Sequence, residues 1–461
     1  MNNEQISGKV WTGPFIWLLL LSVSYFYCLP LLRTGSILGI TASEVRIYDV
    51  IFLAGFLVFV LPRINSIFST WIKYSPAHRY LLYWLLIALI GLGVTLITRE
   101  NRFIIGVVRY IRFFSFSIVF ILGFLIIKNR KQLRILFDAL LISIALVAVV
   151  GALQGAGRFP ILWPDYYSVY WQSEDGYLAT ATLSPNHTHY SLIMAIGVVM
   201  VIARQRIFPS EFLLNSMFAV SSLPMVYSMI ASKGRSGWLV LGVYFIYLLL
   251  FSRTSRLWIV AAIALFSVFF FYNQTLEAGN STIGDILKYR SVTTVKETGK
   301  DVFDALEEED KTLIERIDDN RWYIYTNAVS HLLSNPQYLL MGAGFQNASR
   351  GIGGVALGAH NAYLNVVAEH GIGGLIIYLL FFFHFYMLGK RRKALAQTQA
   401  SYYAAEHWQA LFIGMLVVNF FGEIIYPGRS LFTFLGTFFI MAVVFLHPAW
   451  NENVIRTGAQ K

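Results

Sequence analysis

The sequence is poor in charged residues and in cysteine. Asp, Glu, Lys and Arg together make up 13% of its 461 residues, whereas an ordinary soluble domain carries about 25%. This scarcity, together with 57% hydrophobic residues, all but excludes a soluble enzyme and argues against a disordered or collagen-like chain. The one cysteine, Cys28, cannot by itself form an internal disulfide or a zinc cluster.

Long apolar runs are abundant instead, and they predict a polytopic membrane protein. A helix crosses the hydrocarbon core with about 20 mostly apolar residues, and the 11 Trp and 26 Tyr residues suit the two membrane interfaces. We therefore predict an all-α fold of about 12 transmembrane helices, organised as one integral membrane domain over residues 1–461. The predicted spans are residues 14–32, 47–61, 80–97, 103–127, 133–154, 188–203, 212–231, 237–251, 257–272, 363–388, 408–426 and 430–447.

Basic residues in the connections predict the orientation of the chain. Lys and Arg clusters follow the second, fourth, sixth, eighth and tenth spans, so the positive-inside rule makes all of these connections cytoplasmic. The clusters are Arg63, Lys73 and Arg79; Lys128, Arg130, Lys131 and Arg134; Arg204 and Arg206; Arg253 and Arg256; and Lys390, Arg391, Arg392 and Lys393. Both termini are then cytoplasmic, and the two long connections, residues 155–187 and 273–360, are external.

The second long external connection has an uneven distribution of charge. It holds nine acidic residues between positions 301 and 319, a pattern that predicts a solvated helical segment over residues 300–335. The chain as a whole has a net charge of +11, so the remaining sequence is more basic than this figure suggests. Part of that excess lies on the predicted external side, where topology does not require it, and this favours an anionic substrate there.

Five cations carry this external excess. Arg109 and Arg112 lie one turn apart in the fourth span, Lys233 and Arg235 lie in the short turn before the eighth span, and Arg321 follows the acidic stretch. Charges in or beside membrane spans are costly and are candidates for function, and arginine suits phosphate because its planar guanidinium binds two oxygens at once. Snorkelling to the outer headgroups is the alternative for Arg109 and Arg112, and pairing with nearby acids is the alternative for Arg321.

Histidine residues open two of the predicted spans on the external side. His360-Asn361 follows a glycine-rich stretch before the tenth span, and Asn186-His187 opens the sixth. Histidine exchanges protons near neutral pH, so His360 is a candidate general base, with a structural role as the alternative. His187 and His189 are spaced as a poor pair of metal ligands, and no third ligand follows at a suitable spacing. We therefore predict neither a metal nor a cofactor.

Several of these motifs resemble those of one family of membrane enzymes. His360-Asn361, nine further residues and then Gly371-Ile-Gly-Gly374 resembles the His-Asn-x9-Gly-x-x-Gly signature of the O-antigen ligase and polymerase superfamily. The turn from Ser232 to Trp238 is similar to the Ser-Arg-Gly turn of that family, with Lys-Gly-Arg in place of the commoner arrangement. Further elements of the family pattern are Pro185-Asn186, Asn320-Arg321-Trp322, Asn335-Pro336 and Gly342-Ala-Gly344.

The resemblance implies a GT-C-like glycosyltransferase in the bacterial inner membrane, with its active site on the periplasmic side. Such an enzyme transfers a glycan from undecaprenyl diphosphate to an acceptor hydroxyl, with inversion at the anomeric carbon and without a metal. By position, the resemblance implies that Arg235 and Arg321 bind the diphosphate and that His360 is the general base. We add further predicted diphosphate ligands and residues that position the acceptor or the glycan: Lys233, Arg109 and Arg112 for the first role, and Asn361, Asn186 and His187 for the second.

The acceptor depends on the branch of the superfamily. A polymerase accepts another lipid-linked repeat, a ligase accepts lipid A-core, and protein-directed members accept a hydroxyl on a protein. The motifs do not separate these branches, and we lean slightly to a polymerase because surface polysaccharide polymerases are numerous. Membrane lipid and a chain-length regulator are further expected partners, whereas nucleic acid is not.

A polytopic transporter or a lipid-linked glycan flippase is the alternative from a different functional class. Twelve spans with both termini inside is a common layout for transporters. Transporters place their polar sites near the bilayer midplane, often at broken helices, whereas the unusual cations and histidines of this sequence cluster toward one face. An uptake or flipping assay in vesicles separates the two classes.

Overall fold

A computed structural model of the chain provides the fold. The structure describes residues 10–27, 36–37, 40–41, 46–98, 100–156, 158, 172–173, 176–177, 187–232, 234–252, 313–352, 361–422, 425–426 and 432–452.

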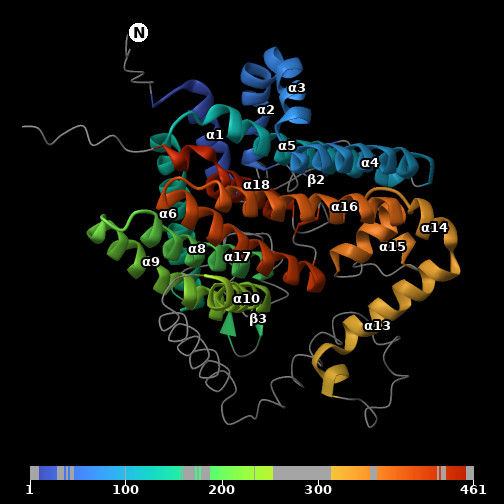
Figure 1. Ribbon diagram of the computed structural model, residues 1–461. Coiled ribbons are helices and arrows are strands. Elements are labelled where there is room, and N and C mark those ends of the chain that lie inside the picture. The colour runs from blue at the N-terminus through green and yellow to red at the C-terminus, as the bar shows by residue number, and fades with distance from the viewer. Residues whose placement is uncertain are drawn as a thin grey trace, which may run out of the picture.

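The described part of the chain is an all-α membrane fold (Figure 1). Its α-helices are α1 (Gly13–Ser24), α2 (Ile47–Gly55), α3 (Ile64–Tyr74), α4 (Pro76–Thr98), α5 (Glu100–Ile126), α6 (Arg130–Gly155), α8 (His187–Ile207), α9 (Phe212–Ala231), α10 (Arg235–Phe251), α13 (Leu313–Ser334), α14 (Pro336–Met341), α15 (Ala348–Gly351), α16 (Ala362–Ala394), α17 (Gln399–Phe421) and α18 (Phe432–Leu446). A π-helical turn (Phe56–Val60) and a 3-10 turn (Leu61–Arg63) continue α2, and a second 3-10 turn (Pro448–Asn451) follows α18.

Two small antiparallel hairpins accompany the helices. In the first, β1 (Ser36–Ile37) pairs with β2 (Ile40–Thr41). In the second, β3 (Gln172–Ser173) pairs with β4 (Gly176–Tyr177). Each strand has two residues, so the hairpins do not form a layer of the fold.

Every predicted span that the structure describes contains a helix, although the spans 14–32 and 408–426 run past the ends of α1 and α17, and no span was predicted for α3. For example, α9 has the predicted bounds, residues 212–231, and α16 extends the predicted span 363–388 at its C-terminal end. The ninth predicted span, residues 257–272, lies outside the described residues, as do most of the two long connections. Helix α13 covers residues 313–334 of the segment that we predict as helical over residues 300–335.

Seven of the described helices are long and apolar enough to cross a membrane. They are Pro76–Thr98, Gly106–Ile126, Arg130–Gly155, His189–Ile207, Phe212–Ala231, Ala362–Ala394 and Phe434–Asn451, and two shorter apolar helices are Gly13–Ser24 and Ser236–Phe251. Helix α17 is not among them, because polar residues that include Glu406, His407 and Asn419 lower its mean hydropathy. The protein is therefore an all-α polytopic membrane protein, and the total of 12 spans stays a prediction.

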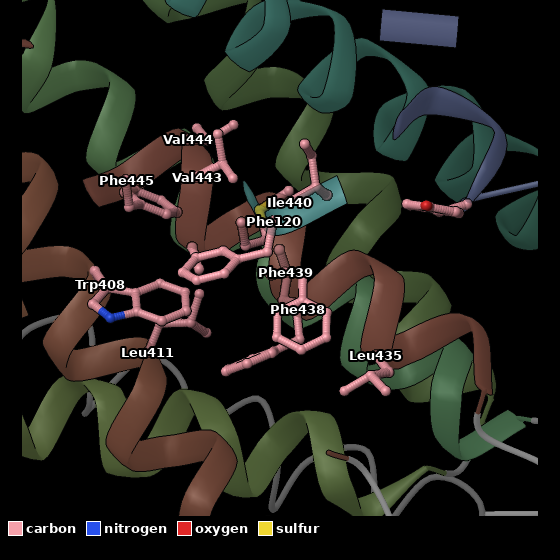
Figure 2. Close-up of a cluster of buried hydrophobic side chains, with 14 of the residues drawn as sticks. Phe120, Trp408, Leu411, Leu435, Phe438, Phe439, Ile440, Val443, Val444 and Phe445 are labelled. Atoms are coloured by element: carbon pink, nitrogen blue, oxygen red, sulfur yellow. The ribbon is translucent and has the colours of Figure 1, made fainter. Parts of the chain in front are cut away.

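The buried core is built around α18. This helix is apolar on every side, as expected of a helix that is enclosed by others. Aromatic rings from neighbouring helices pack against it: the ring of Phe120 in α5 lies 5.6 Å from that of Phe439, and the ring of Trp408 in α17 lies 5.6 Å from that of Phe438 (Figure 2). The core thus joins α5, α17 and α18.

Helices α10 and α17 are antiparallel neighbours. The hydroxyl of Tyr244 lies 2.6 Å from Nδ1 of His407. Further toward the start of α10, a Cβ added at Gly414 would lie 2.8 Å from the carbonyl oxygen of Val240. Small residues permit close backbone approach of this kind between membrane helices. The first residues of α10 therefore lie beside the last residues of α17.

The same end of α17 also meets the first residues of α16, and the start of α10 meets the start of α8. The hydroxyl of Tyr363 in α16 donates to the carbonyl oxygen of Leu416 at 3.3 Å, and Ser191 Oγ in α8 donates to the carbonyl oxygen of Gly234 at 2.7 Å. We call this end of the bundle, where α8, α10 and α16 begin and α17 ends, the motif end. All the sequence motifs of interest that the structure describes lie at or near it.

Candidate functional site

The start of α16 carries the second residue of the His-Asn motif. Asn361 is the N-cap of this helix, and its Oδ1 accepts hydrogen bonds from the backbone N–H groups of Tyr363 at 2.9 Å and Leu364 at 3.1 Å. An asparagine in this position stabilises a helix start because the first amides have no partner within the helix. Asn361 is buried, whereas the neighbouring His360 lies outside the described residues. The cap fixes the backbone directly after His360.

The turn between α9 and α10 places Arg235 at the first position of α10. Its N-cap is Gly234, which is held to α8 by the Ser191 hydrogen bond. A Cβ added at Gly237 would lie 2.3 Å from the carbonyl oxygen of Ser191, so this turn approaches α8 at a distance that only glycine allows. Lys233 lies outside the described residues, and the structure describes the backbone of Arg235 without its side chain.

Helix α13 brings the position of Arg321 toward the motif end. One turn after Arg321, the hydroxyl of Tyr325 donates to the carbonyl oxygen of Phe420 at 3.2 Å, near the end of α17. Ala328, a further turn on, is buried in a small apolar cluster with Ala368 of α16. The side chain of Arg321 is not described, but residues 321, 325 and 328 share one face of a helix, so the backbone places position 321 on the face that contacts α16 and α17.

Phe420 of α17 links the helices that carry the motifs. The ring of Tyr363 lies 5.8 Å from the ring of Phe420, and Tyr325 is bonded to its carbonyl oxygen. Because α10 runs antiparallel to α17, its first residue, Arg235, lies at the same level. The structure therefore brings the backbone of position 235, the backbone of position 321 and the capped start of α16 to one end of α17.

A glycine-rich loop ties α16 to α4 at this end. We call residues 342–347 the clasp. Helix α16 is interrupted at Gly371, whose φ of +67° lies in the region that favours glycine. Beside the interruption, the amides of Ala343 and Gly344 in the clasp donate to the carbonyl oxygens of Ala368 at 2.7 Å and Glu369 at 3.1 Å.

The opposite side of the clasp is bonded to α4. The amide of Phe345 donates to the carbonyl oxygen of Gly91 at 3.0 Å, and Thr95 Oγ1 donates to the carbonyl oxygen of Phe345 at 2.7 Å. Gly344 has a φ of +100°, and a Cβ there would lie 2.6 Å from Thr95 Oγ1. The Gly342-Ala-Gly344 element of the sequence pattern is therefore explained by close backbone packing between two membrane helices.

The structure gives protein partners to both arginines of α5. Arg112 is buried, and its guanidinium binds Asp49 of α2 through Nε at 3.0 Å and Nη2 at 2.8 Å. Arg109 is half-buried, and its Nη1 donates to Oε1 of Gln346 in the clasp. Of the two, only Arg109 is thus brought to a motif element, and the predicted role of both as diphosphate ligands stays a prediction.

The start of α8 also lies at the motif end. His187 is its first residue, described by backbone only, and Asn186 lies outside the described residues. His189 is buried, and its ring lies 5.8 Å from the ring of Phe434 in α18. His189 is thus part of the packing between α8 and α18, whereas the predicted acceptor-positioning role of Asn186 and His187 stays a prediction.

Sequence reasoning missed a buried polar group on α16. Glu369 is 3% exposed, and its Oε2 accepts a hydrogen bond from the hydroxyl of Tyr426, beyond the end of α17. The adjoining backbone is held by Asn419 Oδ1, which accepts from the amide of Ile425 at 3.0 Å, and by Tyr378, whose hydroxyl donates to the carbonyl oxygen of Ile425 at 2.5 Å. The available signal was an acidic residue inside an apolar run, which is a functional or structural candidate by default.

The opposite end of the bundle holds its own ionic network. Arg204 is fully buried, and it binds Asp138 of α6 through Nε at 2.9 Å and Glu211 through Nη2 at 2.8 Å. A hollow of about 710 Å³ lies beside this network and is lined by Arg134, Ser210, Glu211, Phe212, Leu213, Leu214 and Met217. The pairing accounts for the charge of Arg204, and the hollow lies away from the motifs.

Metal binding has no support in the described part of the chain. Among those residues, no group of three or more His, Cys, Asp or Glu side chains is placed to hold a metal ion. The segments that meet at the motif end instead carry two arginines in their sequence, Arg235 and Arg321. Such residues suit an anion, because guanidinium groups donate hydrogen bonds to phosphate oxygens.

The fold and the motif end define a helical membrane protein that gathers basic and amide-rich segments at one end of its bundle. Residues 220–379, from α9 into α16, match the sequence model of the O-antigen ligase family. This match supports the assignment of the chain to the O-antigen ligase and polymerase superfamily, and it confirms the resemblance. No curated protein matches the chain.

The family assignment carries a general function. It implies an enzyme of the glycosyltransferase or ligase type, with a lipid-linked glycan and an acceptor as its substrates. It also points to a bacterial membrane protein. The matched segment contains the turn before α10, α13, the clasp and the start of α16, which are the elements that meet at the motif end.

Replacing Gly237 with alanine is expected to destabilise the protein and to displace the start of α10. The added Cβ would overlap the backbone of Ser191, and overpacking of this kind costs about 1–3 kcal/mol. The matched control is Gly242→Ala in the same helix, where the added Cβ meets open space. Thermal unfolding of the purified variants in detergent measures the difference, and equal melting temperatures for the two variants would contradict the packing.

Proposed function

We propose that the protein transfers a glycan from undecaprenyl diphosphate to an acceptor hydroxyl on the outer face of the bacterial inner membrane. The observation that carries the proposal is the convergence at one end of α17. There the structure places the backbones of positions 235 and 321 beside the capped start of α16, directly after His360. Two arginines and a histidine in one place suit the cleavage of a bond between a sugar and a diphosphate.

The arginines are assigned to electrostatic stabilisation of the departing diphosphate. Arg235 and Arg321 bind the diphosphate, with Lys233 as a further cation from the same turn. When the bond between the anomeric carbon and the diphosphate oxygen breaks, the electron pair stays on the diphosphate. Fixed cations stabilise this developing charge, and they act more strongly in a site that excludes water than they would in solution. Arg112 is left out of this group because its guanidinium already binds Asp49.

His360 has the acid–base part. It takes the proton from the acceptor hydroxyl as that oxygen forms its bond to the anomeric carbon. Attack from the side opposite the diphosphate inverts the configuration at this carbon. Asn361 holds the backbone next to His360 through its helix cap, and Asn186 and His187, at the start of the sixth predicted span, are assigned to positioning of the acceptor. No metal takes part in this scheme.

The orientation follows from the loop charges. With the connections after even-numbered spans in the cytoplasm, the motif end is periplasmic, and both termini are cytoplasmic. The donor is then reached from the outer leaflet, where the acceptor is also found. A GT-C-like arrangement, with the active site between membrane helices and a long external connection, fits this location.

The identity of the acceptor distinguishes a polymerase from a ligase, and the proposal includes both activities. Surface glycans from a strain that lacks the gene separate the two activities. Single repeats on lipid A-core indicate a polymerase. Polymer that remains on the lipid carrier indicates a ligase.

Alanine at position 235 or 321 is expected to abolish transfer while the protein still accumulates in the membrane. Removing one preorganised donor to developing charge costs about 10²–10³ in rate, and lysine is also expected to be poor because it loses the planar fork. The measurement is polymer formation by complemented cells, with Lys390→Ala, an exposed cation at the other end of α16, as the control. Polymer at wild-type levels in either alanine variant would refute the diphosphate assignment.

Alanine at position 360 is expected to lower the transfer rate by about 10²–10⁴, the usual contribution of a general base. The variant is also expected to lose the decline in activity toward low pH that protonation of a base produces. Rates of the purified enzyme over a range of pH measure both effects. His384→Ala serves as the control, since His384 lies far from the start of α16 and its ring stacks on the ring of Tyr80 in α4, with 4.6 Å between the centroids. Normal glycan assembly with alanine at position 360 would exclude the general-base role.

A further inference from the structure

Helix α16 and the clasp depend on each other at the interruption of the helix. A helix that is interrupted leaves carbonyl groups without their usual partners four residues on, and a membrane interior offers no water to replace them. Here the carbonyl oxygens of Ala368 and Glu369 accept hydrogen bonds from the clasp amides at 2.7 and 3.1 Å. The position of the clasp therefore decides whether the carbonyl oxygens of Ala368 and Glu369 keep their hydrogen bonds.

The clasp itself contains a conformation that its surroundings must maintain. Gln346 has a φ of +63°, and it is the one non-glycine residue with a positive φ among the described residues. The backbone of a non-glycine residue is strained at a positive φ, and such a conformation persists only where neighbouring groups hold it. Gln346 is 6% exposed, so its side-chain amide is buried with its backbone. The group that binds this amide is consequently well placed to hold the clasp.

Arg109 is such a group. Its Nη1 donates to Oε1 of Gln346, and hydrogen bonds from a charged donor are stronger than neutral ones. Arg109 comes from α5, so the clasp is held from three membrane helices: α4 through Gly91 and Thr95, α5 through Arg109, and α16 through its freed carbonyls.

The clasp also lies between the two parts of the chain that the proposed reaction needs. Before it, α14 and α13 lead back to Arg321; after it, α15 and residues 352–360 lead on to His360. Within the clasp, Asn347 Nδ2 donates to the carbonyl oxygen of Ala343 at 3.0 Å, which closes the loop on itself. A shift of the clasp would accordingly change the distance between the diphosphate-binding position and the base.

We propose that Arg109 is a positioning residue, which acts through Gln346 on the clasp and so sets the start of α16 against α13, and that it is not a ligand of the diphosphate. This inference rests on the proposed function only for its kinetic consequence. Its structural part, that Arg109 holds the clasp, stands without any substrate. The two parts are therefore tested by separate measurements.

The substrate-free test is hydrogen exchange of the purified protein. In Arg109→Met, the amides of Ala343 and Gly344 are expected to exchange faster than in the wild type, because the clasp is no longer held. The matched control is Arg112→Met, one turn along the same helix, whose partner is Asp49; it is expected to leave exchange in the clasp unchanged. Unchanged exchange in Arg109→Met would overturn the proposal, whatever the protein's activity proves to be.

The kinetic test is a double-mutant cycle with undecaprenyl-diphosphate-linked oligosaccharide as the donor. Arg109→Met and Gln346→Leu are each expected to lower kcat by about 10- to 100-fold, as misplaced catalytic groups do, with the donor KM unchanged. The double variant is expected to be no worse than either single variant, because both changes remove one interaction. A raised donor KM for Arg109→Met, or effects that multiply, would identify a diphosphate ligand and overturn the proposal.

A rescue experiment with glycine at position 346 gives a third measurement. It tests the proposal even if Arg109→Met loses activity because it folds poorly. Glycine adopts a positive φ without strain, so adding Gln346→Gly to Arg109→Met is expected to recover part of the lost kcat. A ligand of the diphosphate could not be rescued by a glycine in the clasp. No recovery in the double variant would overturn the proposal, and a wild-type protein without any transferase activity would instead remove the proposed function.

Discussion

The arrangement of the motif end depends on the interruption of α16 at Gly371. Gly371 has a φ of +67°, a conformation that favours glycine. The helix is kinked there, and the carbonyl oxygens of Ala368 and Glu369 accept hydrogen bonds from the clasp. The nine residues between Asn361 and Gly371 form a helical segment about 14 Å long at 1.5 Å per residue. The spacing in the His-Asn-x9-Gly signature therefore has a mechanical meaning in this protein. It is the length of helix that separates the capped start, beside His360, from the point at which the clasp is attached.

Buried charge by itself does not mark the substrate site. Several buried cations are neutralised by acidic partners inside the bundle or at its ends: Arg112 by Asp49, Arg204 by Asp138 and Glu211, and Lys393 by Glu406. Ions removed from water need such partners, because desolvation is costly. What distinguishes Arg235 and Arg321 is their location: their backbones lie beside the His-Asn helix start, within the segment that matches the O-antigen ligase family. The case for a diphosphate therefore rests on position.

The fold was predictable from the sequence because local composition is enough to identify a membrane helix. Apolar length is a property of one segment, and runs such as residues 212–231 coincide with helices. Helix α3 was missed because its 11 residues are too short for a span, although Ile67 and Trp71 follow a helical period and are buried. For the site, the local motifs were predictable but their partners were not. Arg109 and Gln346 are 237 positions apart, and Arg112 and Asp49 are 63 apart, so no local pattern could pair them.

The central claim is that the protein breaks the bond between the glycan and its lipid diphosphate. The most direct test places the purified protein in liposomes with undecaprenyl-diphosphate-linked oligosaccharide and an acceptor, and measures free undecaprenyl diphosphate together with glycosylated acceptor. The account predicts that the two products appear in equal amounts. Movement of the oligosaccharide across the bilayer while still attached to its lipid, with neither product formed, would contradict it and identify a flippase.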